Sequence, residues 1–204
     1  MPGRGPATVT HEVRRARIID ATIECLSRDG WHGTTLSAVA REAGISRGLI
    51  SYHFAGRDDL HSAVLESVAA TVFGAGAAEV EERIAAAPTA GEKLQAYIEG
   101  NLRFIDSHRR EMAALAELMP NLRRSDGTPR YDDASEEPII AGTAAVFEYG
   151  ASTGEFRVVD TRMTAYMLRR CIDGAASKIV ADPDFDLDAY ARELTDLFLK
   201  GVRA

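Results

Sequence analysis

The segment 47–53 carries side chains whose types and spacing suit contact with a nucleic acid. Arg47 can donate two hydrogen bonds to one guanine, and Gly48 lets the backbone approach DNA closely. Tyr52 and His53, on the same outer face, suit contact with phosphates or base edges. The pattern therefore indicates a helix whose outer face contacts DNA.

Two short helices are needed to present this face. Apolar spacing predicts one helix over 36–43 and another over 47–53, joined through 44–46 with Gly44 at the turn. A tight glycine turn between two short helices is the cue for a helix-turn-helix. The side chains expected to form its small core are Val39, Ile45, Ile50 and Phe54.

Residues 34–60 read T-T-L-S-A-V-A-R-E-A-G-I-S-R-G-L-I-S-Y-H-F-A-G-R-D-D-L, and this stretch resembles the DNA-binding domain of TetR-family transcriptional regulators. The resemblance covers about Ala16 to Leu65, and the alternative for the segment is a helical hairpin in a core. It implies an all-α regulator with a three-helix DNA-binding head followed by a helical bundle for ligand binding and dimerisation. Ser51 departs from the pattern, because members often carry an aromatic residue there.

Further contacts are expected around this helix. Thr35 lies at the N-terminus of the first helix, where a phosphate is favoured, and Arg57 is expected to reach another phosphate. Arg14, Arg15 and Arg17 fit phosphate contact and a solvated helix face equally well. The residues expected at the DNA are Thr35, Ser46, Arg47, Gly48, Leu49, Ser51, Tyr52, His53 and Arg57.

The remaining periodicity predicts an all-α chain of about nine helices. The expected parts are a disordered arm over 1–9, a helix-turn-helix domain over 10–57, and a ligand-binding and dimerisation domain over 58–204. One helix over 58–87 bridges from the head, and Gly74 and Gly76 weaken its middle. The polar stretch 121–137 is expected to be a loop.

Apolar and aromatic side chains beyond the bridge suit a small-molecule pocket. The alternative is ordinary core, which is favoured for any single residue, whereas the family resemblance favours a pocket. Arg103, His108 and Arg170 have the charge or polarity to orient an anionic or polar ligand. The expected ligand contacts are Tyr97, Phe104, His108, Met112, Leu115, Met119, Phe147, Met163, Tyr166, Met167 and Arg170.

The last two helices carry more apolar surface than one small core demands, so we expect a homodimer through them. Such a dimer would bind a palindromic double-stranded operator. Its two DNA-binding heads would lie one DNA turn apart, about 34–36 Å, or a whole number of turns apart. The residues expected at this interface, with internal core as the alternative, are Leu168, Ile172, Ala175, Ala176, Ile179, Leu187, Leu194, Leu197 and Phe198.

The net charge of −7 argues against a nucleic-acid binder until its distribution is considered. Residues 1–57 contain eight arginines and five carboxylates, so their net charge is +3. Residues 58–204 therefore carry a net charge of −10. Cys25 and Cys171 lack CxxC spacing, which indicates free thiols in a reducing compartment. We find no secretory signal and no apolar run of membrane-spanning length, so a cytoplasmic protein is expected.

Motifs for enzyme chemistry are missing from the sequence. It has no glycine-rich phosphate loop, nucleophile elbow or HExxH spacing, and His108 with Glu111 makes only half a metal site. We therefore expect no enzyme, cofactor or metal. The expectation is a ligand-responsive regulator, by family default a repressor released by a small-molecule effector. The alternatives are an activator of the same family, or a helical small-molecule-binding protein with weak or lost DNA binding.

Overall fold

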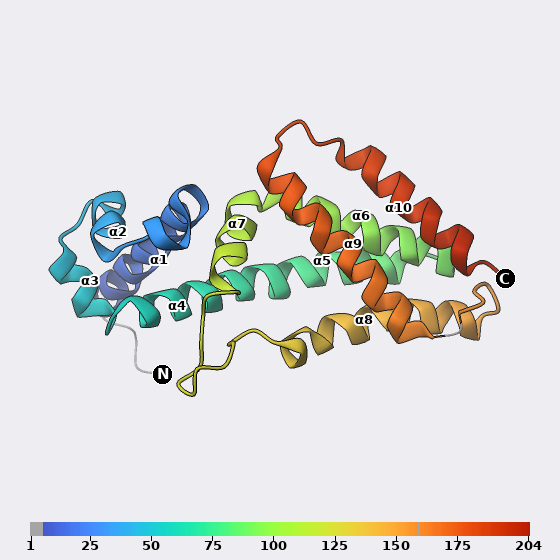
Figure 1. The fold of residues 1–204 in the computed structure, drawn as a ribbon, viewed down its shortest axis with the longest axis horizontal. Coiled ribbons are helices and arrows are strands. Elements are labelled where there is room, and N and C mark those ends of the chain that lie inside the picture. The colour runs from blue at the N-terminus through green and yellow to red at the C-terminus, as the bar shows by residue number, and fades with distance from the viewer. Residues whose placement is uncertain (1–5, 159) are drawn as a thin grey trace. The chain divides into compact units, whose positions relative to one another are not determined.

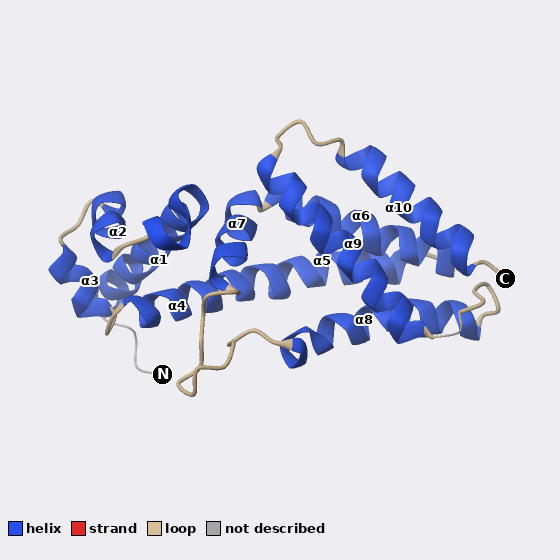
Figure 2. Ribbon diagram, viewed as in Figure 1, coloured by secondary structure: helices blue, strands red, loops and turns tan. Residues whose placement is uncertain are grey.

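The structure is a computed structural model that describes residues 6–158 and 160–204, without the side chains of residues 6–9, 72, 73 and 75. Over this part of the chain the fold is all-α and has no strands, which confirms the predicted class (Figures 1 and 2). None of the described helices is long and apolar enough to cross a membrane. The helices are α1 (Pro6–Gly33), α2 (Leu36–Ala43), α3 (Arg47–His53), α4 (Arg57–Ala69), the π-helix η1 (Ala70–Gly76), α5 (Ala77–Ala86), α6 (Ala90–Ser107), α7 (Arg109–Leu118), α8 (Asp133–Ser152), α9 (Thr161–Ala181) and α10 (Leu187–Val202).

The chain divides into two compact units, whose bounds differ from the expected domains. Unit 1 comprises Met1–Thr71 and Ala113–Arg130, and unit 2 comprises Val72–Met112 and Tyr131–Ala204. The first boundary therefore falls inside η1 rather than after Arg57. The second half of α7 belongs to the same unit as the helix-turn-helix.

Unit 1 is a helix-turn-helix packed on the inner face of α1. Its buried side chains come from every helix of the motif: Ile18, Leu26, Val39, Ile50, Phe54 and Leu60. Ile45, expected in this core, is half-buried. Because α1 begins at Pro6, residues 6–9 are helical where a disordered arm was expected. The rest of that arm, residues 1–5, lies outside the described residues.

The end of α1 is held by a contact from α7. Gly30 has a φ of 70°, a left-handed conformation that breaks the helix and favours glycine. Directly after it, the N–H of Trp31 donates to Oε2 of Glu117 at 2.7 Å. A carboxylate from the second segment of unit 1 therefore satisfies a backbone donor at the break in α1.

Unit 2 packs α6, α8, α9 and α10 around one apolar core. Its fully buried side chains include Leu94, Ile98, Leu102, Phe147, Leu168, Ile172 and Ile179. Local contacts fix two helix starts in this unit. Thr89 and Glu92 form a capping box at the start of α6, and the Phe185 and Tyr190 rings lie 5.6 Å apart across the start of α10.

The connector between α8 and α9 ties unit 2 together. Both carboxylate oxygens of Glu155 accept the N–H of Ala90 at 3.0 Å, and this contact lowers the pKa of Glu155. The Phe156 ring packs so closely on Gly150 that a Cβ there would lie 2.1 Å from the ring. The start of α6 and the end of α8 are thereby fixed to one short segment.

Two element predictions were wrong in part. The helix expected over 58–87 is interrupted by η1, in the stretch that holds Gly74 and Gly76. The loop expected over 121–137 ends earlier, because Asp132 and Ser135 form a capping box that starts α8. Pro138 is tolerated in the second turn of α8, where one backbone hydrogen bond is lost.

Candidate DNA interface and effector pocket

Helices α2 and α3 each begin at a capping hydroxyl. Thr35 Oγ1 accepts the N–H of Ala38 at 3.1 Å, and Ser46 Oγ accepts the N–H of Leu49 at 3.3 Å. Between the helices Gly44 adopts a left-handed φ of 64°, as its place at the turn predicts. Both capping side chains are exposed, and each hydroxyl keeps its own hydrogen to donate to an acceptor such as phosphate.

Helix α3 presents most of the expected DNA contacts to solvent. Its exposed residues are Arg47, Gly48, Ser51 and Tyr52. Tyr52 is 74% exposed, unusually high for an aromatic side chain, while Leu49 and His53 are half-buried. The opposite face carries Ile50, which is fully buried and fixes the rotation of the helix about its axis.

Two of the expected contacts are already engaged within the protein. The Ser51 hydroxyl donates to the Arg47 carbonyl at 3.4 Å, inside α3. The Arg57 guanidinium lies 4.5 Å from the Trp31 ring centroid and donates to the Trp31 carbonyl. The expectation for Arg57 is thus corrected: its side chain joins the start of α4 to the end of α1 and is not directed outward to a phosphate.

A further group on this side of unit 1 escaped the sequence interpretation. The His11 ring, on α1, lies 4.3 Å from the His53 ring and 6.0 Å from the Tyr52 ring, both on α3. No local signal marks His11, because its partners lie about forty residues away along the chain. Only the packing of α1 against α3 brings the three rings together.

The expected ligand contacts divide into separate groups. Tyr97 and Phe147 are buried in the core of unit 2, and Tyr97 Oη lies 2.5 Å from Thr143 Oγ1 in a buried hydrogen bond. Met112 packs against the same core. Leu115 and Met119 belong instead to unit 1.

The expected contacts on α9 lie at the surface of the isolated chain. Met163, Tyr166 and Met167 are 56%, 47% and 50% exposed. Arg170 is also exposed, and it pairs with Glu136 at 2.7 Å and Asp173 at 3.0 Å. The prediction that these residues line an enclosed pocket is therefore corrected, because the helix turns its other face to the core.

That other face holds most of the residues expected at a subunit interface. Leu168, Ile172, Ala175 and Ile179 are buried in the core of unit 2, as is Leu194 of α10. Internal core, the alternative for this set, is what the structure supports for them. Leu197 is different, since it is 65% exposed.

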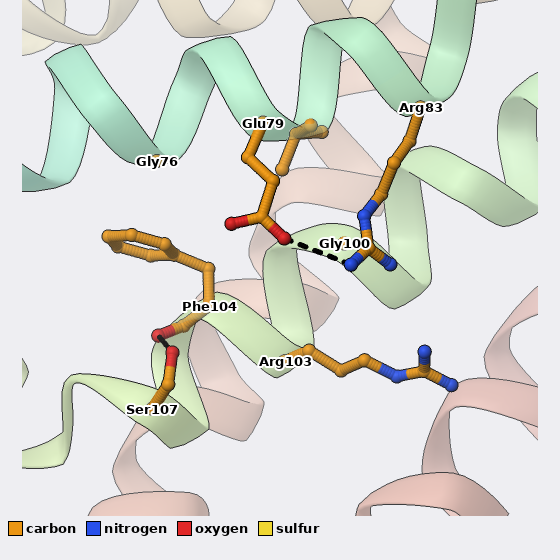
Figure 3. Close-up of a pocket in the computed structure, with 8 residues that line it drawn as sticks. Gly76, Glu79, Arg83, Gly100, Arg103, Phe104 and Ser107 are labelled. Atoms are coloured by element: carbon orange, nitrogen blue, oxygen red, sulfur yellow. Dashed lines mark hydrogen bonds and ion pairs between the residues drawn. The ribbon is translucent and has the colours of Figure 1, made fainter. Parts of the chain in front are cut away.

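A cavity of about 180 Å³ lies between α5 and α6, within unit 2 (Figure 3). Its wall on α5 carries Glu79 and Arg83, paired at 2.9 Å. On α6, Arg103 is loosely paired, 3.4 Å from Glu99 and 4.0 Å from Asp188. Both guanidinium groups of the cavity wall thus have carboxylate partners, and those of Arg103 are the more distant.

Phe104 is the expected ligand residue that lines this cavity, and its ring is held on two sides. It stacks on His108 with centroids 4.1 Å apart. It also lies against Gly76, where a Cβ would come within 2.3 Å of the ring. Since Gly76 ends η1, the aromatic wall of the cavity touches the irregular segment of the bridge. Such π-helical segments occur frequently at functional sites.

Sequence reasoning also missed a polar cluster inside unit 2. Arg169 donates to Asp173 at 2.7 Å and to Asn101 at 3.1 Å, and its side chain is only 14% exposed. A desolvated guanidinium needs such partners, and this one joins α9 to α6. Every partner lies within the protein, so the cluster acts as an internal brace.

The comparisons with known proteins agree with this architecture. Residues 18–64 match the sequence model described as "Bacterial regulatory proteins, tetR family". The HTH-type transcriptional regulator BetI of Burkholderia ambifaria is 35% identical over 96 residues, which are 47% of this chain and 48% of that protein. The chain thus spans about half the length of the first curated relatives it matches.

Other likenesses extend over nearly the whole chain. The HTH-type transcriptional regulator BetI of Cronobacter sakazakii is 26% identical over 196 residues, covering 96% of this chain and 93% of that protein. The crystal structure of a putative transcriptional regulator from Pseudomonas aeruginosa PAO1 is similar with a TM-score of 0.71 and 25% identity. That similarity covers 93% of this chain and 90% of the other.

The fold and the exposed α3 define a helix-turn-helix protein with a second, helical unit. Within that class, residues 18–64 match the DNA-binding domain of the TetR family of bacterial regulators, and nearly the whole chain is similar to transcriptional regulators that carry such a domain.

Proposed function

We propose that the protein is a ligand-responsive transcriptional repressor that binds a palindromic operator as a homodimer and is released by a small-molecule effector. The observation that carries this is α3, a capped helix whose residues Arg47, Gly48 and Tyr52 are exposed within the matched domain. An exposed arginine can hydrogen-bond to base edges in the major groove, and the glycine beside it lets the helix backbone come close to the DNA. We assign it no catalytic role, and as a DNA-binding regulator it would act in the cytoplasm.

The proposed DNA contacts follow from exposure. Arg47 and Tyr52 would contact bases or phosphates, and the hydroxyls of Thr35 and Ser46 would donate to phosphates. Gly48 would allow the close approach, and Leu49 and His53 would lie at the margin of the contact. Ser51 contributes less, because its hydroxyl is used within the helix.

The proposed dimer face is the outer side of α9. Met163, Tyr166 and Met167 follow one another at helical spacing, and all three are exposed. Exposed apolar side chains that cluster in this way mark interaction surfaces in soluble proteins. Leu197 of α10 would extend the same interface, which retains the proposal that the last two helices join two copies.

The proposed effector site is the cavity between α5 and α6. A buried apolar cavity of about 150 Å³ holds benzene, so about 180 Å³ suits a ligand with a single ring. Phe104 and Val80 supply apolar walls, and the loosely paired Arg103 is available for an anionic group. We therefore propose a small aromatic or short-chain carboxylate as the effector.

The effector would act by shifting a population. A ligand changes the DNA affinity only through its different affinity for the DNA-competent and released states. Contact of the cavity wall with the end of η1 gives the ligand a route to the bridge segment.

The test has two steps, beginning with selection of bound duplexes from a random pool. We expect a palindromic consensus whose binding weakens steeply with salt, as phosphate contact requires. Weak, salt-insensitive binding to every duplex would favour the ligand-binding alternative without a DNA role. Promoter fusions carrying the selected site would then separate a repressor from an activator.

In the second step, sodium benzoate is titrated into the protein bound to the selected duplex, with benzamide as the uncharged control. We expect benzoate to raise the thermal unfolding midpoint of the free protein and to release the duplex, and Arg103→Gln to abolish both effects. Arg192→Gln, an exposed arginine on α10, is the matched control. Benzoate that binds equally well to Arg103→Gln would exclude this cavity as the anion site.

A further inference from the structure

Three aromatic rings from two helices meet beside the proposed DNA-contacting face of α3. His11 of α1 lies 4.3 Å from His53, and Tyr52 lies 5.2 Å from His53 in an edge-on arrangement. The His11 and Tyr52 centroids are 6.0 Å apart. His11 therefore extends the exposed surface of α3 with a residue from the first turns of α1.

The charged groups that act on His53 are positive. His53 is affected by His11, Arg14 and Arg15, all on α1. Burial, followed by these three groups, lowers the pKa of His53 below its ordinary value. Arg15 is also held close by, with its guanidinium 5.1 Å from the Phe54 ring.

His53 has hydrogen-bonding capacity that the protein leaves unused. Both of its ring nitrogens are buried, and neither has a hydrogen-bond partner within the described residues. A neutral imidazole carries one donor and one acceptor, and a protonated one carries two donors. A proton on the His53 ring therefore requires an anion nearby that offsets the burial of the ring and the surrounding positive charge.

Helix α1 contributes residues to this cluster from outside the matched domain. The family match begins at residue 18, whereas His11, Arg14 and Arg15 precede it. Arg14 and Arg15 were equally well explained by a solvated helix face. The guanidinium of Arg15 lies 5.1 Å from the ring of Phe54, the residue that follows α3, and both arginines lower the pKa of His53.

We propose that His11 and His53, with Arg14 and Arg15, form a second contact to the DNA backbone, and that this contact takes up a proton when the duplex binds. A phosphate is the group that complements the cluster, because it supplies negative charge and accepts hydrogen bonds from the exposed His11 ring and from Arg14. The inference rests on the proposed DNA binding and adds to it a contact from α1.

The sign of the pH effect follows from linkage. A phosphate beside the pair favours its protonated form, so the complex binds more protons than the free protein and duplex. The affinity for DNA therefore rises as the pH falls from 8 to 6. If the phosphate raises the proton affinity of the pair by a factor of ten, the affinity for DNA increases by up to about tenfold.

The experiment measures fluorescence anisotropy of the duplex recovered by selection, at pH 6, 7 and 8 and constant ionic strength. We expect the wild-type chain to bind several-fold more tightly at pH 6 than at pH 8, because the full tenfold effect requires a pH well below the pKa of the free pair. His11→Gln and His53→Gln should each flatten this dependence. His32→Gln is the matched control, since His32 is exposed at the far end of α1.

Calorimetry in buffers of different ionisation enthalpy gives a second readout, the number of protons taken up per duplex. A structural role for the histidines would change the affinity but not this number. Equal pH dependence in the wild type and both variants overturns the contact while leaving DNA binding intact. Failure to bind any duplex at any pH overturns the proposed function as well.

Discussion

Arg47 stands in the first turn of α3, exposed and ahead of an exposed glycine, while Ile50 anchors the same helix in the core. Sequence recognition of DNA is expected to depend on this exposed guanidinium, held on a helix whose orientation is fixed by the core. Arg57 differs, because its guanidinium lies over the Trp31 ring and donates a hydrogen bond to the Trp31 carbonyl. Two arginines that look alike in the sequence therefore have different proposed roles.

Replacing Arg47 by alanine should weaken binding to the selected operator by about 1–3 kcal/mol, or roughly tenfold to a hundredfold, the range for a bidentate base contact. Fluorescence anisotropy measures the change, and Arg192→Ala should bind as the wild type does. Unchanged affinity in Arg47→Ala would remove this residue from the proposed contacts. Arg57→Ala should mainly lower the free energy of unfolding.

His61, on α4, makes the stability of unit 1 sensitive to acid. It is 1% exposed, neither ring nitrogen has a hydrogen-bond partner within the described residues, and it packs on Trp31. Burial, and then the nearby Arg57, lower the pKa of His61 to about 4 from 6.5. Between these values the unfolded chain binds a proton that the folded chain excludes, so stability falls as the pH falls.

The free energy of unfolding should drop by about 2 kcal/mol between pH 7.5 and pH 5 from this group alone. Urea unfolding followed by circular dichroism at both pH values measures the drop. His61→Phe should reduce it, because phenylalanine keeps the ring contact without a titrating group. A drop of equal size in the variant would mean that other groups cause the acid sensitivity.

At the scale of elements, the short segment after α8 has a larger role than its sequence indicates. Glu155 closes the start of α6, Phe156 packs on Gly150, and the N–H of Arg157 donates to the Val202 carbonyl at 2.6 Å. Three helices of unit 2 are thereby joined by consecutive residues. Close approach of the Phe156 ring explains why position 150 holds glycine.

Gly150→Ala should therefore destabilise the protein by about 1–3 kcal/mol, the usual cost of overpacking a core. Gly142→Ala is the matched control on the same helix, because a Cβ at Gly142 meets no atom within 4 Å. It should leave stability unchanged or raise it by up to about 1 kcal/mol. Thermal and urea unfolding compare the two variants, and equal stability would contradict the contact with Phe156.

For the whole molecule, the two units differ in what they leave exposed. The helix-turn-helix exposes a polar and basic helix face, whereas α9 exposes Met163, Tyr166 and Met167. The net charge divides in a similar way along the chain: it is +3 for residues 1–57 and −10 for residues 58–204. The net charge of −7 is therefore compatible with DNA binding by the head.

Light scattering at micromolar concentration should give twice the mass of one chain. Tyr166→Glu should give the mass of a single chain, because a carboxylate in the centre of an apolar interface is left without a partner. Ala85→Glu, at an exposed position on α5, should remain dimeric. A monomeric wild type, or a dimeric Tyr166→Glu, would contradict the proposed face.

The sequence by itself determined what depends on neighbours along the chain. Periodicity predicted α2 and α3 with their bounds, and both helices begin at a hydroxyl group that caps a backbone N–H three residues further on. The motif at Gly44 gave the helix-turn-helix for the same reason.

Only the tertiary structure decided which face of each helix is covered and which distant side chains meet. It turned Leu168 and Ile172 inward and left Met163 and Tyr166 outside, although periodicity alone allowed both stripes to be buried. It paired His11 with His53 and Arg57 with Trp31, over separations that carry no local signal. Such contacts depend on how helices pack against one another, so residue spacing within one helix does not encode them.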